Sequence, residues 1–525
     1  MMAGVGGSVA VRAWQEPEEP AIIPRPARLL PRNGEFRLNS GTRVVADAGT
    51  RTEGEWLAAV LGCPVSVGAP RDGAVALRLD PSLARLGREG YVLEVTPQRV
   101  SVRGSTAAGV FYGAQTLRQL LPPAAFSAAG RGGARWHIPC LEIEDSPRFP
   151  WRGSLVDTAR HFKPTAAILK YIDVLALHKI NTLHLHLTDD QGWRIEIKKY
   201  PKLTEIGSVR SQTRVGHERK SQGFDGKPHG GYYTQDNVRE IVAYANTRHL
   251  NVVPEIEMPG HAQAALAAYP EFGNTGEKLE VWTQWGVSKN VFGVSEKTFR
   301  FLEDVLSEVL ELFPSRHIHV GGDEVPPDQW QASPEAQARI RELSLKNESG
   351  LHTWFIGRIN QFLRARGRTL VGWDEIIEGG MIPGAVVMSW RGVKGGIEAA
   401  RHGHDVVMTP TSHTYFDYYQ SKDLKEPLAI GGLITLEKVY SYEPVPSDLS
   451  AEEAKRVLGT QGQLWSEYMP TPEHMEYMAF PRMCALAEVA WTPPERKDYS
   501  DFQRRLRIHL ERLRALGVHF HPLNA

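Results

Sequence analysis

From residue 148 onward, short apolar runs alternate with segments whose apolar residues recur every three or four positions. The helical spacing is widest after Ser295, where Phe299, Leu302 and Val305 begin an apolar stripe, and a second such segment starts at Pro164. The runs between these segments predict eight strands, at Gly153–Asp157, Thr182–Leu187, Asn251–Ile256, His317–Gly321, Thr369–Gly372, Ala385–Ser389, Asp405–Thr409 and Gln461–Leu464. Strands and helices in alternation predict an α/β fold, a (β/α)8 TIM barrel.

The chain ahead of this pattern predicts a small N-terminal α+β accessory domain. Two alternating runs, Tyr91–Val95 and Arg99–Arg103, flank a short turn and predict a hairpin. A helix is expected from Ala107 to Leu121, ended by two prolines, and the last helix of the chain from Phe502 to Leu516. The predicted organisation is a tail at 1–20, the accessory domain at 21–147, and the barrel with its C-terminal helices at 148–525.

Charge and cysteine usage narrow the classes of partner and site. The formal net charge is zero, from 61 basic and 61 acidic residues, which favours neither nucleic acid nor a membrane as partner. The three cysteines, Cys63, Cys140 and Cys484, lack the spacing of a disulfide framework or a zinc site. The apolar run from Val5 to Ala13 is a poor signal peptide. We therefore expect a cytoplasmic protein, or a secreted one if this N-terminus has been trimmed or misassigned.

Charged and aromatic residues follow nearly every predicted barrel strand. Barrel enzymes place their chemistry at the carboxyl ends of the strands, so these residues are expected to share one ligand site. Three of the 13 tryptophans are among them, and an indole stacks well on the apolar face of a sugar ring. The residues are Asp157, Arg160, Asp189, Asp190, Glu257, His261, Asp323, Glu324, Trp373, Asp374, Glu375, Trp390, Tyr415, Asp417, Trp465 and Glu467.

The adjacent carboxylates Asp323 and Glu324 stand out within this ring. Gly321 and Gly322 precede them, so the backbone can bend there and let a ligand approach without interference from a Cβ atom. Two carboxylates in one pocket resist joint ionisation, which raises the pKa of one of them. A glycosidase needs such a pair, one acid and one anion. On the dipeptide alone, a helix-capping Asp beside a salt-bridged Glu explains the pattern equally well.

The wider segment, His317-Ile318-His319-Val320-Gly321-Gly322-Asp323-Glu324, resembles the signature of the glycoside hydrolase family 20 β-N-acetylhexosaminidases. Five other elements match that family in order along the chain. They are Asp157-Thr158-Ala159-Arg160-His161-Phe162 with His184-Leu185-His186-Leu187-Thr188-Asp189-Asp190, Glu255-Ile256-Glu257-Met258-Pro259-Gly260-His261, Gly372-Trp373-Asp374-Glu375, and Gln463-Leu464-Trp465-Ser466-Glu467. The resemblance runs from about residue 21 to the C-terminus. It implies an exo-acting, retaining enzyme that releases terminal β-linked N-acetylglucosamine or N-acetylgalactosamine.

The resemblance also implies roles for single residues. Glu324 is expected to be the general acid and then the general base, while Asp323 holds the acetamido N–H and Tyr415 the acetamido oxygen. That oxygen belongs to the substrate and is the nucleophile, so an oxazolinium intermediate forms. Expected sugar-binding groups are Arg160, Asp417 and Glu467 at the hydroxyls and Trp373, Trp390 and Trp465 at the walls. Asp189 and His261 are expected near Glu324, where they would tune its proton affinity, although a capping aspartate and an interior histidine explain them as well.

Two other functions compete with this one. His184 and His186 alternate onto one face of a strand and resemble the ligand pair of metal-dependent barrel amidohydrolases. A non-catalytic sugar-binding barrel would keep the tryptophans but needs no proton donor. The preferred function requires no cofactor and no metal, and its partner is an oligosaccharide or glycoconjugate with a terminal N-acetylhexosamine.

Two long inserts, Gly207 to Tyr232 and Glu271 to Lys297, are expected to form loops over the barrel mouth. Some family members place a tryptophan beyond the cleaved bond, but no Trp lies between Asp417 and Trp465. Tyr440 or Tyr442 is the candidate substitute. The choice between gluco and galacto sugars depends on contacts at O4. Arg160, Asp417 and Glu467 can make such contacts with either sugar, so the sequence predicts no preference.

Overall fold

The computed structural model describes residues 19–127 and 135–523. The run Val5 to Ala13, and with it the prediction about a signal peptide, lies outside these residues. Within the described ranges, no helix combines the length and the apolar character that crossing a membrane requires.

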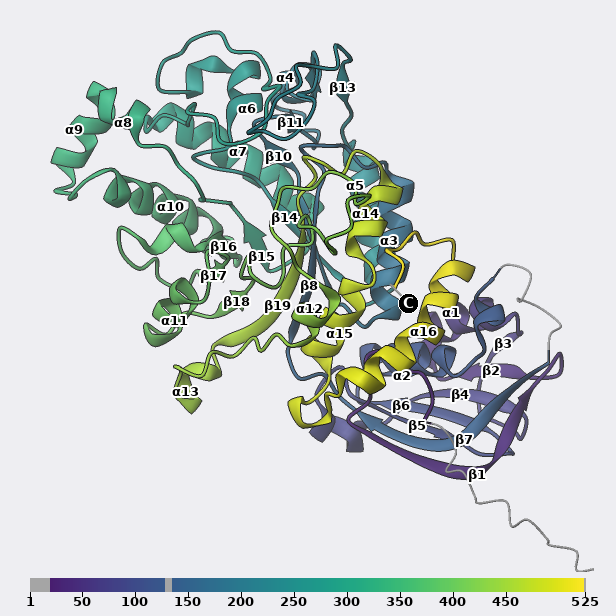
Figure 1. Cartoon of the computed structure of the whole chain (residues 1–525). Helices are drawn as coiled ribbons and strands as arrows, with labels where there is room; N and C mark the ends of the chain where they lie inside the picture. Colours follow the sequence, from purple (N-terminus) through teal and green to yellow (C-terminus); the bar gives the residue numbers. More distant parts are fainter. Residues whose placement is uncertain (1–18, 128–134, 524–525) are drawn as a thin grey trace, which may run out of the picture.

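The N-terminal domain is a seven-stranded mixed sheet covered by two helices (Figure 1). The sheet order is β1-β7-β5-β6-β4-β2-β3, and the strands are β1 (Arg28–Leu38), β2 (Arg43–Ala46), β3 (Val65–Val67), β4 (Ala74–Leu79), β5 (Tyr91–Val95), β6 (Val100–Gly104) and β7 (Trp136–Asp145). The helices are α1 (Arg51–Leu61) and α2 (Ala107–Gln119). The antiparallel pair β5–β6 is the predicted hairpin, which is confirmed. Helix α2 is buried between this sheet and the barrel, because its core cluster also contains Ala176 and Trp491.

The second domain is a closed barrel of eight parallel strands, as predicted. The strands are β8 (Trp151–Asp157), β9 (Thr182–His186), β14 (Asn251–Glu255), β15 (His317–His319), β16 (Thr369–Trp373), β17 (Val386–Ser389), β18 (Val406–Met408) and β19 (Val457–Leu464). The main helices around them are α3 (Thr165–Leu177), α5 (Gln235–Asn246), α7 (Glu296–Leu312), α10 (Glu348–Arg364), α11 (Lys394–Arg401), α14 (Pro472–Ala479), α15 (Arg482–Trp491) and α16 (Tyr499–Ala515). Ser295 caps α7 through the backbone N–H of Thr298, at 3.2 Å.

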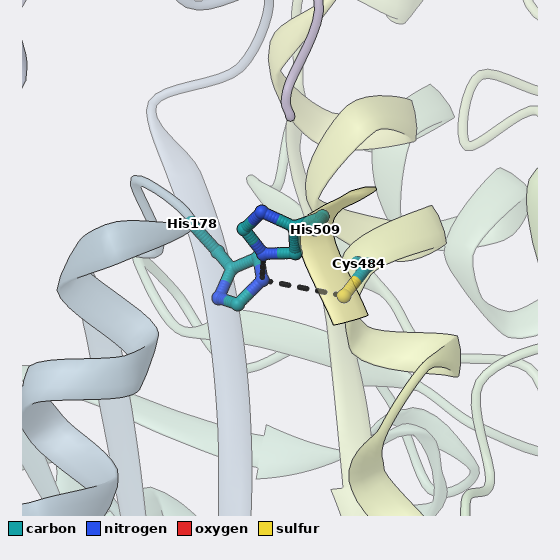
Figure 2. Close-up of side chains that lie close together, drawn as sticks. All are labelled: His178, Cys484 and His509. Carbon is teal, nitrogen blue, oxygen red and sulfur yellow. Dashed lines mark hydrogen bonds between the residues drawn. The ribbon is translucent and has the colours of Figure 1, made fainter. Parts of the chain in front are cut away.

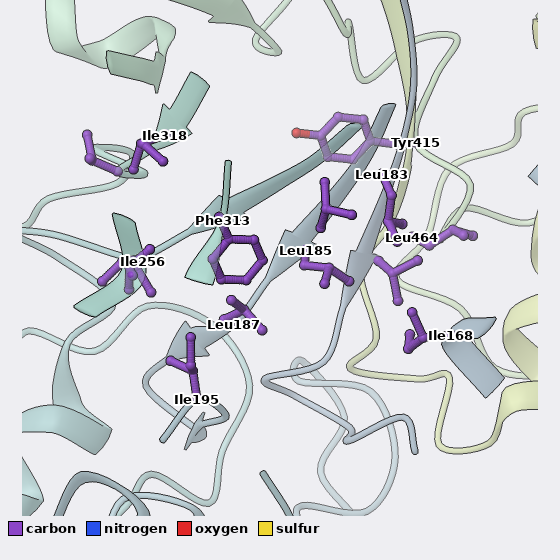
Figure 3. Close-up of a cluster of buried hydrophobic side chains, with 14 of the residues drawn as sticks. Ile168, Leu183, Leu185, Leu187, Ile195, Ile256, Phe313, Ile318, Tyr415 and Leu464 are labelled. Atoms are coloured by element: carbon purple, nitrogen blue, oxygen red, sulfur yellow. The ribbon is translucent and has the colours of Figure 1, made fainter. Parts of the chain in front are cut away.

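Side chains on each barrel strand alternate between an outer and an inner layer. On β9, Leu183 and Leu185 pack outward with Ile168 of α3 in the large apolar cluster of which Figure 3 draws a part. The inner layer holds a smaller apolar cluster that includes Val371, Trp373 and Met388. Polar side chains share this interior and are fully buried: His184, His186, Glu255, His319, Gln461 and Gln463. The barrel therefore has a polar centre inside an apolar shell.

A second buried polar cluster lies outside the barrel, where α3, α15 and α16 meet (Figure 2). His178 Nε2 lies 2.8 Å from His509 Nε2 and 3.2 Å from Cys484 Sγ, and His178 Nδ1–H donates to the Val174 carbonyl at 2.7 Å. Two nitrogen ligands of one tetrahedral zinc ion would stand about 3.3 Å apart, given bonds of about 2.0 Å. The separations instead fit hydrogen bonds, which join the C-terminal helix to the barrel.

Two buried cations join the domains. Arg152, on the first barrel strand, donates to both oxygens of Glu89 at 2.8 and 3.0 Å and also to the Lys179 carbonyl at 2.8 Å. Lys179 Nζ lies 3.1 Å from Asp145 Oδ2 at the end of β7. Both side chains are completely buried, so the accessory domain and the barrel share one continuous interior.

Candidate active site

A cavity of about 440 Å³ opens at the carboxyl ends of the barrel strands. Nine of the predicted site residues line it: Arg160, Asp323, Glu324, Trp373, Trp390, Tyr415, Asp417, Trp465 and Glu467. The other two, Asp189 and His261, are buried behind this lining and contact it. The structure thus brings these eleven residues together from the ends of all eight barrel strands. Five other residues that were expected to share the site do not line the cavity: Asp157, Asp190, Glu257, Asp374 and Glu375.

The backbone after β15 aims the two carboxylates into the cavity. Gly321 and Gly322 have φ of +65° and +87°, and Glu324 itself has φ of +47°. The space beside the glycines is occupied by protein. A Cβ atom at Gly321 would overlap the carboxyl group of Glu257, and one at Gly322 would lie 2.6 Å from Ile376 Cγ2. The prediction that these glycines make room for a ligand is therefore wrong, because side chains from the neighbouring strands fill that room.

The two carboxyl groups differ in exposure and in pKa. Burial, with the negative charges of Glu324 and Glu255, raises the pKa of Asp323 to about 6. The Glu324 side chain is 42% exposed, and its interaction with the His261 imidazole lowers its pKa. Without substrate, a proton shared by the pair therefore stays mainly on Asp323. Among the described residues Asp323 Oδ1 has no hydrogen-bond partner, so it is free to accept from a ligand.

A chain of charged groups supports this pair from behind. His261 Nε2 lies 3.6 Å from both Asp323 Oδ2 and Glu324 Oε2, and its Nδ1 lies 3.2 Å from Asp189 Oδ1. Asp189, on the short hairpin of β10 (Thr188–Asp189) and β11 (Gly192–Trp193), also binds Arg160 Nη2 at 2.8 Å. Although burial alone would lower it, the pKa of His261 lies well above the usual value because Asp189 and Asp323 face it. A positive imidazolium therefore stands next to both carboxylates.

Three groups that line the cavity have raised pKa values, which favours their neutral forms. Burial and the charge of Asp417 raise the pKa of the Tyr415 hydroxyl, and burial with the charge of Glu467 raises that of Asp417. Burial likewise raises the pKa of Glu467 against the opposing effect of Arg160. Asp417 Oδ1 is buried and has no hydrogen-bond partner in the part of the chain that the structure describes. These groups are suited to a neutral, hydroxyl-rich ligand.

Three tryptophans form the walls. Trp373 is 1% exposed, and its indole N–H donates to Glu255 at 2.9 Å. Trp390 donates to Glu375 at 2.9 Å and stacks near Tyr415, with ring centroids 6.1 Å apart. The guanidinium carbon of Arg160 lies 5.2 Å from the ring centroid of Trp465. Trp373 and Trp390 are thus anchored through their indole N–H groups, and Trp465 packs against the Arg160 guanidinium.

Residues that the sequence reasoning did not single out complete the lining. They are Glu218, Gly286, Val287, Thr411, Tyr418 and Ile430. Glu218 and Val287 come from the two long inserts, so the prediction that these inserts reach the barrel mouth is confirmed. Tyr440 and Tyr442 were the wrong aromatic residues: both are buried and lie away from the lining, with Tyr440 bound to Glu488. Tyr418 is the additional tyrosine at the cavity. Its position directly after Asp417 is the sequence feature that could have predicted it.

His184 and His186 point into the barrel, as their alternation predicted, but neither lines the cavity. His184 Nδ1 lies 3.0 Å from Gln461 Nε2, and His186 bonds to the carboxylates of Glu255 and Asp189. Both imidazoles are at most 1% exposed. Their nitrogen atoms are thus directed at buried protein partners below the cavity.

Two family models match the chain. Residues 149–494 match the catalytic domain of glycosyl hydrolase family 20, and residues 19–146 match its domain 2. A β-hexosaminidase of Porphyromonas gingivalis is 44% identical over 510 residues, which cover 95% of this chain but 64% of that longer protein. A β-N-acetylhexosaminidase of Cellulomonas fimi is 32% identical over 516 residues, or 95% of this chain and 96% of the relative.

Solved structures of the family superpose over nearly the whole chain. The family 20 β-N-acetylhexosaminidase of Streptomyces coelicolor A3(2) matches with a TM-score of 0.83 and 33% identity, covering 96% of this chain and 97% of that one. A mutant β-hexosaminidase of Streptomyces plicatus in complex with its product GlcNAc gives a TM-score of 0.83 and 34% identity, covering 97% and 98%. By sequence, fold and domain order, the chain belongs to glycosyl hydrolase family 20.

Proposed function

We propose that this protein is an exo-acting, retaining β-N-acetylhexosaminidase that removes terminal β-linked N-acetylglucosamine or N-acetylgalactosamine by substrate-assisted catalysis. The observation that carries the proposal is the position of Asp323 and Glu324. The pair stands at the edge of a cavity walled by three tryptophans, in a chain that belongs to a family of such enzymes. The volume of about 440 Å³ suits a single sugar ring.

The lining groups divide into binding and reacting groups. Arg160, Glu467 and Asp417 all line the cavity and are assigned to the outer hydroxyls of the sugar. Arg160 is a fixed donor because Asp189 and Gln191 hold its guanidinium, at 2.8 and 3.0 Å. The three tryptophans enclose the ring and the acetamido methyl. Tyr415 and Asp323 are assigned to the acetamido group, as donor to its oxygen and acceptor for its N–H.

In the first step the acetamido oxygen attacks the anomeric carbon, and the bond from that carbon to the leaving oxygen breaks. Glu324 gives its proton to the leaving oxygen, and the ring closed on the acetamide is an oxazolinium ion, stabilised by the Asp323 anion. In the second step water attacks the anomeric carbon and gives its proton to Glu324, while the bond to the acetamido oxygen breaks. Two inversions retain the β configuration.

Substrate binding has to move a proton within the carboxylate pair. Without substrate, the Asp323 pKa is raised to about 6 and the Glu324 pKa is lowered. A bound sugar covers Glu324, which removes water from its carboxylate and raises its pKa. An acetamide N–H bonded to Asp323 stabilises the anion there and lowers its pKa. Both changes favour the form with the proton on Glu324, which the first step requires.

The test compares two chromogenic substrates that differ at one position, 4-nitrophenyl N-acetyl-β-D-glucosaminide and 4-nitrophenyl β-D-glucoside. We expect the first to be cleaved at least about 1000-fold faster, because only the acetamide supplies an internal nucleophile. An N-acetylglucosamine thiazoline should inhibit, with no metal requirement. Glu324→Gln should lose more activity on poor leaving groups than on nitrophenol. Equal rates on the two substrates contradict the mechanism; activity lost to a chelator favours the metal-dependent alternative, and binding without turnover favours the sugar-binding one.

A further inference from the structure

Glu255 lies at the end of β14, inside the barrel and below the cavity, and is completely buried. Both of its carboxylate oxygens are engaged. Oε1 accepts from the Trp373 indole at 2.9 Å and lies 2.7 Å from His319 Nδ1. Oε2 accepts from His186 Nδ1 and lies 3.2 Å from His184 Nε2. One carboxylate on β14 therefore contacts groups from three other barrel strands, β9, β15 and β16.

Two of these contacts lead to the cavity. Trp373 forms one wall of the cavity, and its indole nitrogen, the only polar atom of the side chain, donates to Glu255. His186 Nε2 lies 3.0 Å from Asp189 Oδ2, the oxygen that also binds Arg160, and its ring packs edge-on against Trp465 at 4.9 Å. Since Asp189 also holds His261, the contacts run without a break from Glu255 to the groups beside Glu324.

The hydrogen-bond geometry determines the charge of His186. Each of its ring nitrogens faces a carboxylate oxygen, which can only accept, so both nitrogens carry a proton and the ring is a cation. The pKa of His186 agrees with a charged ring. Burial lowers this pKa, but Glu255 and Asp189 raise it to about 10. Glu255 and His186 are thus an ion pair in the buried interior of the barrel, where removing one partner leaves the other charge unpaired.

We propose that Glu255 is a positioning residue that, with His186, holds Trp373 and Asp189 in the geometry required for the reaction. It touches no atom of the substrate, since it does not line the cavity. Its effect on turnover rests on the proposed function, whereas its effect on Trp373 does not. A shift of about 1 Å in a positioned group can cost about 100-fold in rate.

The experiment compares Glu255→Gln, His186→Gln and the double variant with His184→Gln. His184 is the control residue. It is as buried as His186, lies on the same strand and faces the same Glu255 oxygen, but it makes no hydrogen bond to a cavity residue. Two quantities are measured on folded protein: kcat/KM on the chromogenic glucosaminide, and the indole N–H signal of Trp373 in ¹⁵N-tryptophan-labelled protein, assigned by its loss in Trp373→Phe.

We expect kcat/KM to fall about 100-fold in Glu255→Gln and in His186→Gln, and the double variant to resemble the worse single one, because both act along one path. His184→Gln should stay within about fivefold of the wild type. The Trp373 signal should shift in Glu255→Gln, because that substitution changes the acceptor of the indole N–H. An unmoved Trp373 signal overturns the proposal, as does a multiplicative loss in the double variant. If Glu255→Gln does not fold, the test is the kcat/KM of His186→Gln compared with that of His184→Gln, and equal values overturn the proposal. If the wild-type protein shows no turnover, only the proposed function is overturned, because the Trp373 indole signal is measured without any reaction.

Discussion

At the scale of single residues, Asp323 and Glu324 share a pocket yet differ in pKa for separate reasons. Asp323 is surrounded by carboxylates and removed from water, which favours its neutral form. Glu324 projects toward the opening and faces a histidine cation, which favours its anion. The reacting form of the enzyme contains one proton in this pair, whichever residue holds it before substrate arrives. The pH dependence of kcat/KM reports the two apparent pKa values of the pair.

We expect kcat/KM to fall tenfold per pH unit above about pH 6, because the pair loses its only proton there. It should also fall at pH values below the lowered pKa of Glu324, where the pair binds a second proton. The measurement is kcat/KM on the chromogenic glucosaminide from pH 3.5 to 9. In Asp323→Asn the residual activity should decline at a lower pH than in the wild type, since the remaining carboxyl has the lower pKa. A wild-type profile that is flat up to pH 8 contradicts this assignment.

At the scale of elements, the loop after β15 depends on glycine for protein packing. The positive φ of Gly321 and the Glu257 carboxyl beside it leave no place for a side chain. Gly321→Ala should reduce the free energy of unfolding by about 2–5 kcal/mol, from backbone strain and overpacking together. The measurement is urea unfolding.

The matched control for that substitution is Gly357→Ala in the middle of α10. Nothing lies within 4 Å of a Cβ atom at Gly357, and the helical backbone there suits alanine. That variant should be neutral or more stable by up to about 1 kcal/mol. Equal destabilisation of the two variants would show that the crowding at Gly321 is not what requires glycine.

Most elements of the barrel were predictable from the sequence, because strand and helix periodicities are local. The strand at His317 ends earlier than predicted, at His319, since the turn at Gly321 cannot be seen in an apolar run. The lining residues that closely follow a barrel strand were predictable from the sequence, and those from the long inserts were not. The role of Glu255 was not predictable from the motif that contains it, because its partners lie on three other strands far apart in sequence. Tyr440 was misassigned for the same reason, since its partner Glu488 belongs to α15.

At the scale of the whole molecule, Arg152 joins the barrel to the accessory domain from within. Arg152→Leu leaves the largely buried Glu89 without its cation, which should cost about 3–5 kcal/mol and loosen the two domains from each other. In calorimetry we expect a lower and broader unfolding transition. Arg148→Leu is the control, because its partner Glu443 is 45% exposed and such pairs contribute at most about 1 kcal/mol. If both variants unfold like the wild type, the buried pair does not couple the domains.

The last helix also returns to the first described residues. Arg505 donates to the Ile22 carbonyl at 2.8 Å and Arg512 to the Ala21 carbonyl at 2.6 Å, while α16 lies beside α2 in Figure 1. Ile22 and Arg505 are 483 positions apart. At about 5–20 residues per second, the ribosome makes this arginine roughly half a minute to a minute and a half after it has made Ile22. For that interval the nascent accessory domain exposes carbonyls whose donors do not yet exist, so these contacts between the two domains form only after α16 has been made.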